Sequence, residues 1–494
     1  MKKKLKLFMT VASLCLALAV LCFGVFSATQ ISYTIGGTIS YEIEDVFVKI
    51  TTKVYTSNAQ VDNIDDLKDY ANKFVNSTPT SLGEYEVTNL TNYNDIFDFN
   101  SLTNELDEND SYSPQSKIEM VFGEKANAYS MYIVMNIVNL ADSIVYTHVN
   151  SFTNDIENIV GCTSDSDLRI FKTETDGQTI VLAYSLKDKK QGVEISDFSF
   201  SLGMRCTEPY SYGQLSTSLT PDGDYHDKVK SITITNNEAD FSLKDAYATR
   251  KVGSYGDNND LFAYYIKNGD MYDEFVYAPV NVIYTEQNAD ATFGWWVASF
   301  SDGTYNISDM SKVEILNLKS LDTSKSNIFS GFILNTYSLK KLENFERLDF
   351  SKGNSFNGML AGLQIDCLDM SNMKISEGAS TFAMLGSNDE YLSLFMKSLG
   401  ATEEQINSII KLDLESKKVQ VANMLCNSQI LGSGNLGWYK ALVDSAYNTK
   451  IDKIIAPAYL PKDVQIALTG EYIIEGTDEI TNFLVAGKTL IRKS

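Results

Sequence analysis

One set of side chains combines residue types and spacing that could support chemistry: an asparagine and three aspartates, each following an apolar residue of a repeated strand pattern. The set consists of Asn317, Asp349, Asp369 and Asp413. If the strands stacked in register, these side chains would project about 4.8 Å apart from an exposed strand face. Carboxylates at that spacing repel one another, so hydroxyl or backbone donors, a cation or a basic partner must compensate. Two interpretations stay open, local hydrogen bonding, with Ser351 and Ser371 among the donors, and ligand binding.

Other signatures of catalysis are weak. The chain has only two histidines, His148 and His226, which leaves little material for a histidine-based metal site or catalytic triad. The run Gly432–Gly437 fits the pattern Gly-x-Gly-x-x-Gly, but it follows a short apolar run and suits a loop better than a dinucleotide site. We therefore predict a protein that is not an enzyme, with no catalytic residues, no metal ligands, no cofactor-binding residues and no cofactor.

Composition narrows the functional classes further. The 494 residues include 41 Lys and Arg against 64 Asp and Glu, which gives a formal net charge of -23. A surface this acidic repels phosphate backbones, so we predict no nucleic-acid partner. The apolar fraction of 44% is too high for a disordered chain, and the length predicts two to four domains of about 100–200 residues.

Residues 1–28 have the pattern of an export signal. Four lysines precede an apolar run, Leu7–Phe26, and the small residues Ser27 and Ala28 follow it. The run is long enough to stay in the bilayer as an uncleaved anchor. We predict a secreted or cell-surface protein, either released or anchored by Leu7–Phe26, with no other contact with the membrane.

Four cysteines lie beyond this segment, and none belongs to a Cys-x-x-Cys pair. Such sparse cysteines behave as small buried apolar residues in many proteins. A Cys162–Cys206 disulfide is the alternative, since both residues fall in one predicted domain.

Alternating apolar residues dominate the first two hundred positions after the signal, beginning with Ile31, Tyr33 and Ile35. Many short strands, polar turns and few helical pieces, such as Leu67–Val75, predict an antiparallel β-sandwich over residues 29–207. Residues 208–244 are rich in Ser, Thr, Asp and Gly and predict a linker. Residues 245–300 predict a small β-module that caps the region beyond it.

The last two hundred residues contain a repeat, an apolar-x-apolar strand followed by a Ser or an acid. Its copies are Leu316-Asn317-Leu318, Leu348-Asp349-Phe350, Leu368-Asp369-Met370 and Leu412-Asp413-Leu414. Apolar closing segments such as Met359-Leu360 follow the strands. One such unit cannot bury its apolar face alone, so neighbours must stack. For residues 301–494 we predict a short, irregular leucine-rich-repeat solenoid with a terminal strand module, and for the whole chain a mainly β fold with minor α.

Two resemblances carry these predictions further. The lysine-led signal running into Ala28-Thr29-Gln30, the strand pair Ile31–Ile43 with its Gly-Gly loop, and Met131–Asn139 resemble the TasA/camelysin-like secreted proteins of Gram-positive bacteria. That resemblance implies export through a signal peptidase of the SipW type and, for some members, extracellular fibres.

The repeat region resembles the BspA-type leucine-rich-repeat surface proteins. Leu321-Asp322-Thr323-Ser324 matches their middle segment, and Leu368-Asp369-Met370-Ser371-Asn372-Met373 matches their opening. This resemblance implies a cell-surface protein that adheres to host or matrix components.

From these observations we predict an exported bacterial surface protein that acts in adhesion or in protein or matrix binding through its repeat face. Its partner would be a host, matrix or cell-wall protein or glycan. A structural, fibre-forming matrix protein is the alternative, and a carbohydrate-active enzyme that uses an acidic pair is a further one.

Overall fold

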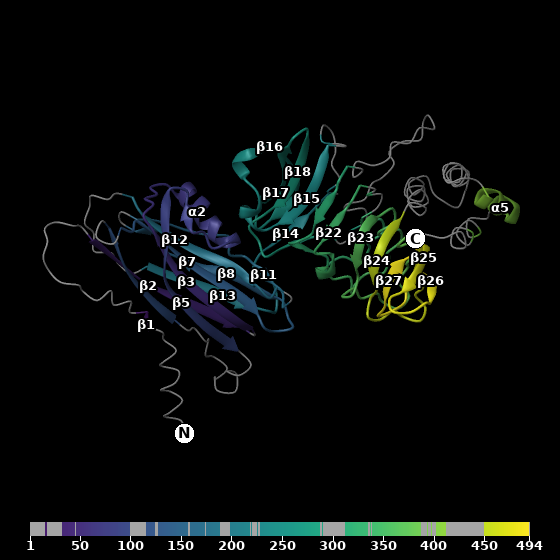
Figure 1. Cartoon of the computed structure of the whole chain (residues 1–494), viewed down its shortest axis with the longest axis horizontal. Coiled ribbons are helices and arrows are strands. Elements are labelled where there is room, and N and C mark those ends of the chain that lie inside the picture. Colours follow the sequence, from purple (N-terminus) through teal and green to yellow (C-terminus); the bar gives the residue numbers. More distant parts are fainter. Residues whose placement is uncertain are drawn as a thin grey trace, which may run out of the picture. The chain divides into compact units, whose positions relative to one another are not determined.

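The computed structural model is mainly β, with four sheets and two α-helices in the part of the chain that it describes (Figure 1). This confirms the predicted class at that level. The described residues are 32–98 except 45, 115–187 except 124–126, 157–158 and 173, 198–286 except 218, 220–224 and 226–227, 312–386 except 334–335 and 337, 402–411 and 449–493, with 15–16, 219, 225, 289, 336, 393 and 397 as short or isolated additions.

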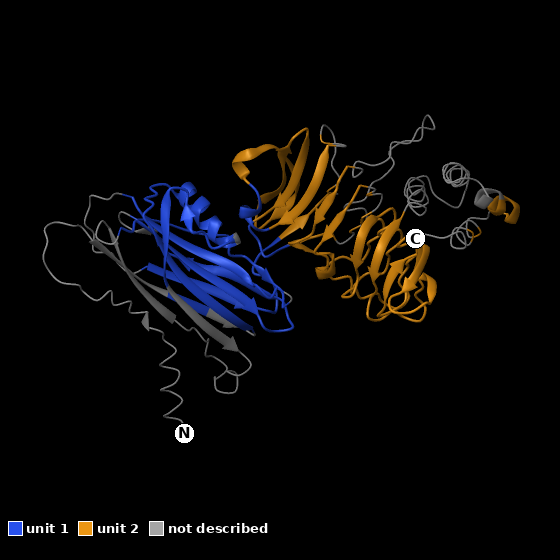
Figure 2. Ribbon diagram, viewed as in Figure 1, with its two compact units in different colours: residues 1–212, 236–241, 279–282 blue, residues 213–235, 242–278, 283–494 orange. Residues whose placement is uncertain are grey.

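The chain divides into two compact units (Figure 2). The first comprises residues 1–212, 236–241 and 279–282, and the second comprises residues 213–235, 242–278 and 283–494. Two short excursions of the later chain therefore belong to the first unit.

The first unit contains a six-stranded and a seven-stranded sheet. The six-stranded sheet has the order β1 (Cys15–Leu16), β6 (Gln115–Gly123), β2 (Ser32–Glu44), β13 (Phe198–Arg205), β8 (Val145–Phe152), β11 (Arg169–Ile170). The seven-stranded sheet has the order β4 (Ser81–Leu82), β5 (Tyr85–Asp98), β3 (Phe47–Ser57), β7 (Ser130–Asn139), β12 (Gln178–Leu186), β10 (Ile159–Thr163), β9 (Asp155–Ile156). Side chains from both sheets fill one buried apolar cluster.

The pairing of β2 with β13 is parallel, so the first sheet is not uniformly antiparallel as the sequence predicted. Alternation of apolar residues reports which face of a strand is buried, but it does not report the direction of the neighbouring strand. The strands β2 and β13, which lie near the two ends of the predicted domain, thus pair with each other, from Gly37 opposite Phe198 to Glu44 opposite Arg205.

Strand β7 is apolar on both faces because each face is covered. Met131, Ile133 and other residues on the same face of the strand belong to the cluster between the sheets. Tyr132 and Val134 point to the opposite side, where they pack with residues of α2 (Ile64–Asn76). Figure 1 shows α2 lying over β7 and β12.

Helix α2 has the expected amphipathic spacing and a defined start. The Asn63 side chain caps it by accepting a hydrogen bond from Asp66 N at 2.8 Å. Leu67, Ala71 and Phe74 lie on one face, at the i, i+4, i+7 spacing that a helix brings together, and are buried against the sheet. The predicted helical piece at residues 67–75 is therefore confirmed.

The second unit contains a nine-stranded and a five-stranded sheet. The nine-stranded sheet has the order β21 (Leu321–Asp322), β19 (Val282–Tyr284), β14 (Tyr212–Leu215), β16 (Ala246–Tyr255), β17 (Asn259–Asn268), β18 (Met271–Tyr277), β15 (Val229–Thr235), β20 (Ile315–Asn317), β22 (Lys341–Glu343). The five-stranded sheet has the order β23 (Gln364–Asp369), β24 (Lys450–Ile455), β27 (Thr489–Arg492), β25 (Ala467–Ile474), β26 (Ile480–Phe483).

Residues 208–244 are not the linker that the sequence predicted. They contain β14 and β15, and β15 lies inside the sheet between β18 and β20. Its Ile232 and Ile234 are fully buried. The Ser and Thr residues of β15 alternate with these isoleucines. The linker prediction relied on the high Ser and Thr content and missed this alternation, which is typical of a strand. The strands of the predicted β-module over 245–300 belong to the same sheet as the first repeat strand, β20.

Residues 321–333, 348–360 and 368–385 form three turns that lie one upon the next. Phe329 N donates to Ser355 O, and Phe356 N donates to Ser380 O, both at 2.7 Å. Inside the turns, the Phe329 ring lies 5.0 Å from Phe350 and 5.6 Å from Phe356 between ring centroids. Each turn thus buries its aromatic residues against the turns beside it.

Several sequence predictions fall on residues outside the described part of the chain. They are the signal segment apart from residues 15–16, the repeat copy at 412–414 and the glycine-rich run 432–437. Helix α5 (Glu403–Lys411) is described, and Thr402 and Gln405 form a capping box before it through two hydrogen bonds, at 2.9 and 3.3 Å.

Removing a ring from the stacked turns tests their shared interior. We expect Phe329→Ala to destabilise the second unit by about 3–5 kcal/mol, because Phe329 is fully buried and its loss leaves a cavity. Denaturant unfolding measures the change. Tyr459→Ala, at a side chain that is 67% exposed, is the control and should stay within about 0.5 kcal/mol of the parent. Equal effects of the two substitutions would contradict the shared interior.

Candidate functional site

Asn317 lies at the end of β20 and is held by its neighbours on β22. Its Nδ2 donates to Glu343 Oε2 at 2.9 Å, and its Oδ1 accepts from Asn344 Nδ2 at 2.8 Å. Its partner in the sheet register is Glu343, not Asp349.

Asn317 Oδ1 also accepts from the backbone N–H of Lys319, two residues on, at 3.1 Å, and Asp349 and Asp369 make the same kind of bond. Each Oδ1 accepts a hydrogen bond from the backbone N–H two residues on, from Ser351 at 2.8 Å and from Ser371 at 2.9 Å. Asp322 does the same with Ser324 at 2.8 Å. These bonds close the turn of each Leu-Asp-x-Ser segment, as aspartates commonly do.

The four residues chosen from the sequence therefore do not form one column. Asn317 and Asp369 are the last residues of β20 and β23, which belong to different sheets. Asp349 lies in no strand, and Asp413 lies outside the described residues. The local hydrogen bonding considered for Asp349 and Asp369 is present. Sequence reasoning paired them with Asn317 and overlooked Asp322, although the shared Leu-Asp-x-Ser pattern was the signal that could have identified the equivalent set.

The structure instead places Asn317 in a different surface, which we call the strand face. It consists of two rows of partly or fully exposed side chains that run across β17, β18, β15, β20 and β22. The first row is Tyr264, Phe275, Thr233, Asn317 and Glu343, and the second is Ile266, Asp273, Ser231, Ile315 and Lys341. Neighbours in a row are about 4.8 Å apart.

The opposite side of these strands is buried. Ile232 and Ile234 of β15 and Leu316 of β20 are fully buried, and they alternate with the residues of the strand face. The strand face is therefore fixed to a packed interior, and its side chains keep their spacing.

The strand face combines aromatic and polar side chains. One end is aromatic, with Tyr264 beside Phe275, and the other end is polar, with Asn317 hydrogen-bonded to Glu343. Ser231 Oγ donates to Asp273 Oδ1 at 2.6 Å, so these two side chains orient each other. Within the described residues, no group of three or more His, Cys, Asp and Glu side chains could hold a metal ion.

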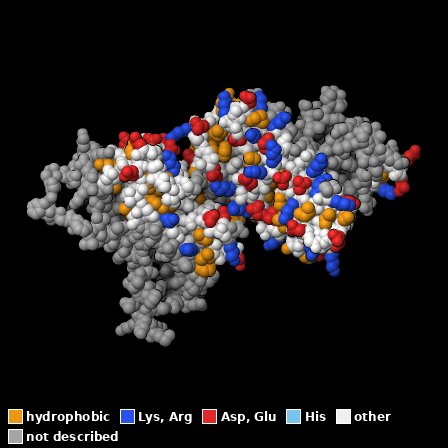
Figure 3. All heavy atoms as spheres, viewed as in Figure 1, with side chains coloured by type: hydrophobic (Ala, Val, Ile, Leu, Met, Phe, Trp, Pro, Cys, Tyr) orange, Lys and Arg blue, Asp and Glu red, His pale blue; other side chains and the backbone are white. Residues whose placement is uncertain are grey.

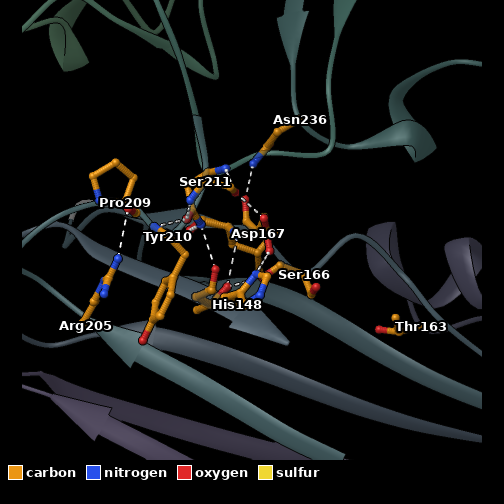
Figure 4. A network of polar contacts seen from close by, with 12 residues as sticks. His148, Thr163, Ser166, Asp167, Arg205, Pro209, Tyr210, Ser211 and Asn236 are labelled. Atoms are coloured by element: carbon orange, nitrogen blue, oxygen red, sulfur yellow. Dashed lines mark hydrogen bonds and ion pairs between the residues drawn. The ribbon is translucent and has the colours of Figure 1, made fainter. Parts of the chain in front are cut away.

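A second polar site lies in the first unit around Asp167, in the loop before β11 (Figure 4). Its Oδ1 lies 2.8 Å from His148 Nδ1, and its Oδ2 accepts from Ser211 Oγ. Asn236 Nδ2 donates to the Asp167 backbone O at 2.7 Å. The carboxylate thus stands between the serine and the histidine. This order does not form a catalytic triad, in which the histidine must contact the serine.

The His148 ring is stacked on Tyr210, with 5.4 Å between ring centroids. The hydrogen bond to Asp167 raises the His148 pKa above 6.5, against the opposing effects of burial and of Arg205. A histidine held in this way carries its charge at a higher pH than a free one.

A further buried carboxyl, Asp165, lies beside the excursion 236–241. Glu238 N donates to its Oδ2, and Lys68 Nζ of α2 binds the Glu238 carboxylate. Burial raises the Asp165 pKa from 3.8 to about 6 and outweighs the Glu238 N–H and the Lys68 charge, which favour the ionised form. The Lys68 pKa is raised: burial lowers it, but the Glu238 hydrogen bond and the two carboxylates exceed that effect.

These contacts hold the returning segments onto the first unit. The fully buried Asn281 completes them: its Nδ2 donates to Thr147 O and Leu168 O at 2.8 Å, and its Oδ1 accepts from Tyr210 N at 2.8 Å. The Asp167 network is therefore primarily structural. Sequence reasoning missed it because the partners of Asp167 lie up to 69 positions away in the chain.

Cys162 and Cys206 do not form the disulfide that the sequence analysis gave as the alternative. Cys162 is buried on the α2 side of the seven-stranded sheet, and Cys206 packs against the cluster between the sheets. Burial raises the Cys162 pKa to about 12, so its thiol stays protonated.

Two further observations bear on the class of protein. No helix among the described residues is both long enough and apolar enough to cross a membrane. On the side of the molecule drawn in Figure 3, acidic and basic side chains of the described surface are interspersed.

Comparison with models of known protein families, with curated proteins and with solved structures finds no match to this chain.

Turn capping by Asp349 can be measured directly. We expect Asp349→Ala to lower the free energy of unfolding by about 1 kcal/mol, because Ser351 N loses its acceptor. Asp349→Asn keeps an Oδ1 and should cost less. Chemical denaturation of both variants measures the difference. Equal losses would show that the carboxylate acts through its charge and not as a turn cap.

The buried Asp165 predicts a pH dependence. Because its folded pKa of about 6 lies above the unfolded value of 3.8, its protonated form favours folding, and that stabilisation is lost as pH rises through about 6. The raised pKa of His148 acts in the same direction, and its contribution is lost only above pH 6.5. Between pH 4 and pH 6 we expect the unfolding free energy of Asp165→Asn to rise relative to the parent.

Unfolding curves of parent and variant at several pH values check this expectation. His148→Gln is the matched control, since it should alter the dependence only above about pH 6.5. Parallel curves for the parent and Asp165→Asn would show that the carboxyl is ionised throughout this range.

Proposed function

We propose that the chain is an exported bacterial surface protein that binds a host, matrix or cell-wall protein or glycan through the strand face. The observation that carries this proposal is the pair of side-chain rows across five strands, with a packed interior behind them. The lysine-led segment 1–28 supports export.

The fold elements support a specific architecture for this role. Two sheets around one buried cluster are consistent with a β-sandwich in the first unit. The backbone bonds between turns 321–333, 348–360 and 368–385 are consistent with a short leucine-rich-repeat solenoid in the second. The Leu-Asp-x-Ser turns supply the resemblance to BspA-type surface proteins.

A preformed sheet face suits binding because little conformational entropy is lost on docking. Aromatic residues supply much of the binding energy in protein interfaces, and Tyr264 and Phe275 lie side by side in the register. Asn317 and Glu343 offer hydrogen-bonding groups at the other end of the same row.

The charge of the chain favours a basic protein partner. Its formal charge of -23 attracts cationic surfaces over distances beyond direct contact. Glu343 places a carboxylate on the strand face, where an arginine or lysine of the partner could meet it.

Binding to immobilised matrix proteins and glycans tests the proposal. For any partner found, we expect Phe275→Ala and Asn317→Ala to weaken binding about tenfold or more each, since each removes a contact worth more than about 1.4 kcal/mol. Tyr459→Ala replaces an exposed aromatic residue elsewhere in the second unit and should bind as the parent does.

Binding that all three variants retain in full would refute the strand face as the binding surface. Purified protein that sediments as fibres would favour the structural matrix role instead, and release of sugar from a glycan panel would favour the enzyme.

A further inference from the structure

A separate hollow lies on the outer side of the seven-stranded sheet, just beyond the end of α2. It has a volume of about 530 Å³, within the range of small-molecule sites. Its lining residues are Thr51, Lys53, Phe74, Val75, Ser77, Thr78, Val134, Asn136, Asp176, Gly177 and Thr179.

The hollow exists because the helix is shorter than the strands it covers. Helix α2 ends at Asn76, and the extended Ser77 and the nearby Pro79 turn the chain away. The outward side chains of β3 and β7 continue past this point, at Lys53 and Asn136.

The polar groups in the hollow are oriented by one another. Asn136 Nδ2 donates to Asp176 O at 2.8 Å and to Thr179 Oγ1 at 3.3 Å. The amide oxygen of Asn136 therefore remains as an acceptor, and the Thr179 hydroxyl, having accepted, keeps its O–H to donate.

Lys53 adds a cationic donor. Its ammonium makes no hydrogen bond or ion pair with any side chain that the structure describes. In a chain with 64 acidic residues, a lysine left in a hollow beside ordered acceptors and donors is an unusual arrangement.

An apolar wall faces these polar groups. Val134 and Phe74 are buried, and the Phe74 ring is fixed by stacking on Tyr132 at 4.6 Å between centroids. On the other side, Gly177 has a φ of 71°, and a Cβ there would lie 2.5 Å from Ile137 O. Only glycine lets this turn lie so close to β7.

We propose that this hollow binds a saccharide. A sugar ring has an apolar C–H face and a rim of hydroxyls that both donate and accept. The wall of Val134 and Phe74 fits that face, the Asn136 oxygen fits a donating hydroxyl, and Thr179 and Lys53 fit accepting oxygens. The proposal does not depend on the strand face, which belongs to the other unit.

The charge around the hollow leaves two saccharide classes to distinguish. Lys53 favours a carboxylate-bearing sugar, whereas the carbonyl end of α2 and Asp176 favour a neutral one. Glucuronic acid and glucose share the ring and differ at this one group, so they separate the two classes.

Titration of the purified full chain with each sugar, followed by calorimetry or by saturation-transfer NMR, tests the site. We expect millimolar or tighter binding of at least one of them. Lys53→Met and Thr179→Val should each weaken it about tenfold, because each removes one donor while keeping the shape of the side chain. Lys49→Met, an exposed lysine of the same strand outside the hollow, is the matched control and should bind as the parent.

The relative affinities of the two sugars identify the group that Lys53 contacts. Stronger binding of glucuronic acid that weakens with salt assigns the Lys53 contact to a carboxylate, and equal binding of both sugars assigns it to a hydroxyl. Absence of binding by the parent protein, or binding that Lys53→Met and Thr179→Val leave unchanged, would overturn the proposal. Phe275→Ala on the strand face should leave sugar binding intact, so failure here and failure of the proposed function are distinguishable.

Discussion

The second unit depends on backbone hydrogen bonds between successive turns. A turn of this length has one apolar side and cannot bury it alone, so Phe329 and Phe356 gain their interior only when the neighbouring turn is in place. The aspartates of the Leu-Asp-x-Ser segments serve the same end, because each caps the bend that returns the chain to the stack. Stacking thereby sets the spacing of successive turns.

The first unit meets a different constraint, since its seven-stranded sheet is apolar on both sides. The six-stranded sheet covers one side, and α2 covers part of the other. The helix ends before the strands do, and the uncovered stretch is polar, with Lys53, Asn136 and Thr179. A sheet region that was merely left bare would favour scattered solvated side chains. Here, instead, hydrogen bonds hold the side chains of Asn136 and Thr179 in a defined orientation, which suits the binding site that we propose.

The sequence predicts the features that follow from local periodicity, but few of the features that depend on pairing between distant segments of the chain. It predicted the β class and the helix near residues 67–75, because each follows from spacing within a few residues. It misplaced β15 as a linker, since a Thr-rich strand resembles a turn in composition. It also aligned Asn317 with Asp349, whereas the register pairs Asn317 with Glu343. The Asp167 network joins segments that are distant in the chain, so no local sequence pattern predicts it.

The chain is rich in acidic residues, but the aspartates described above already make hydrogen bonds within the fold. Asp349 and Asp369 bind backbone N–H groups, and Asp167 binds His148 and Ser211. A carboxylate engaged in this way has less capacity for a ligand, because leaving the turn would expose an unpaired N–H. In the binding role that we propose, the contacts would come from the aromatic and polar residues of the strand face. The arrangement of these residues is set by the register of the sheet rather than by the repeat motif.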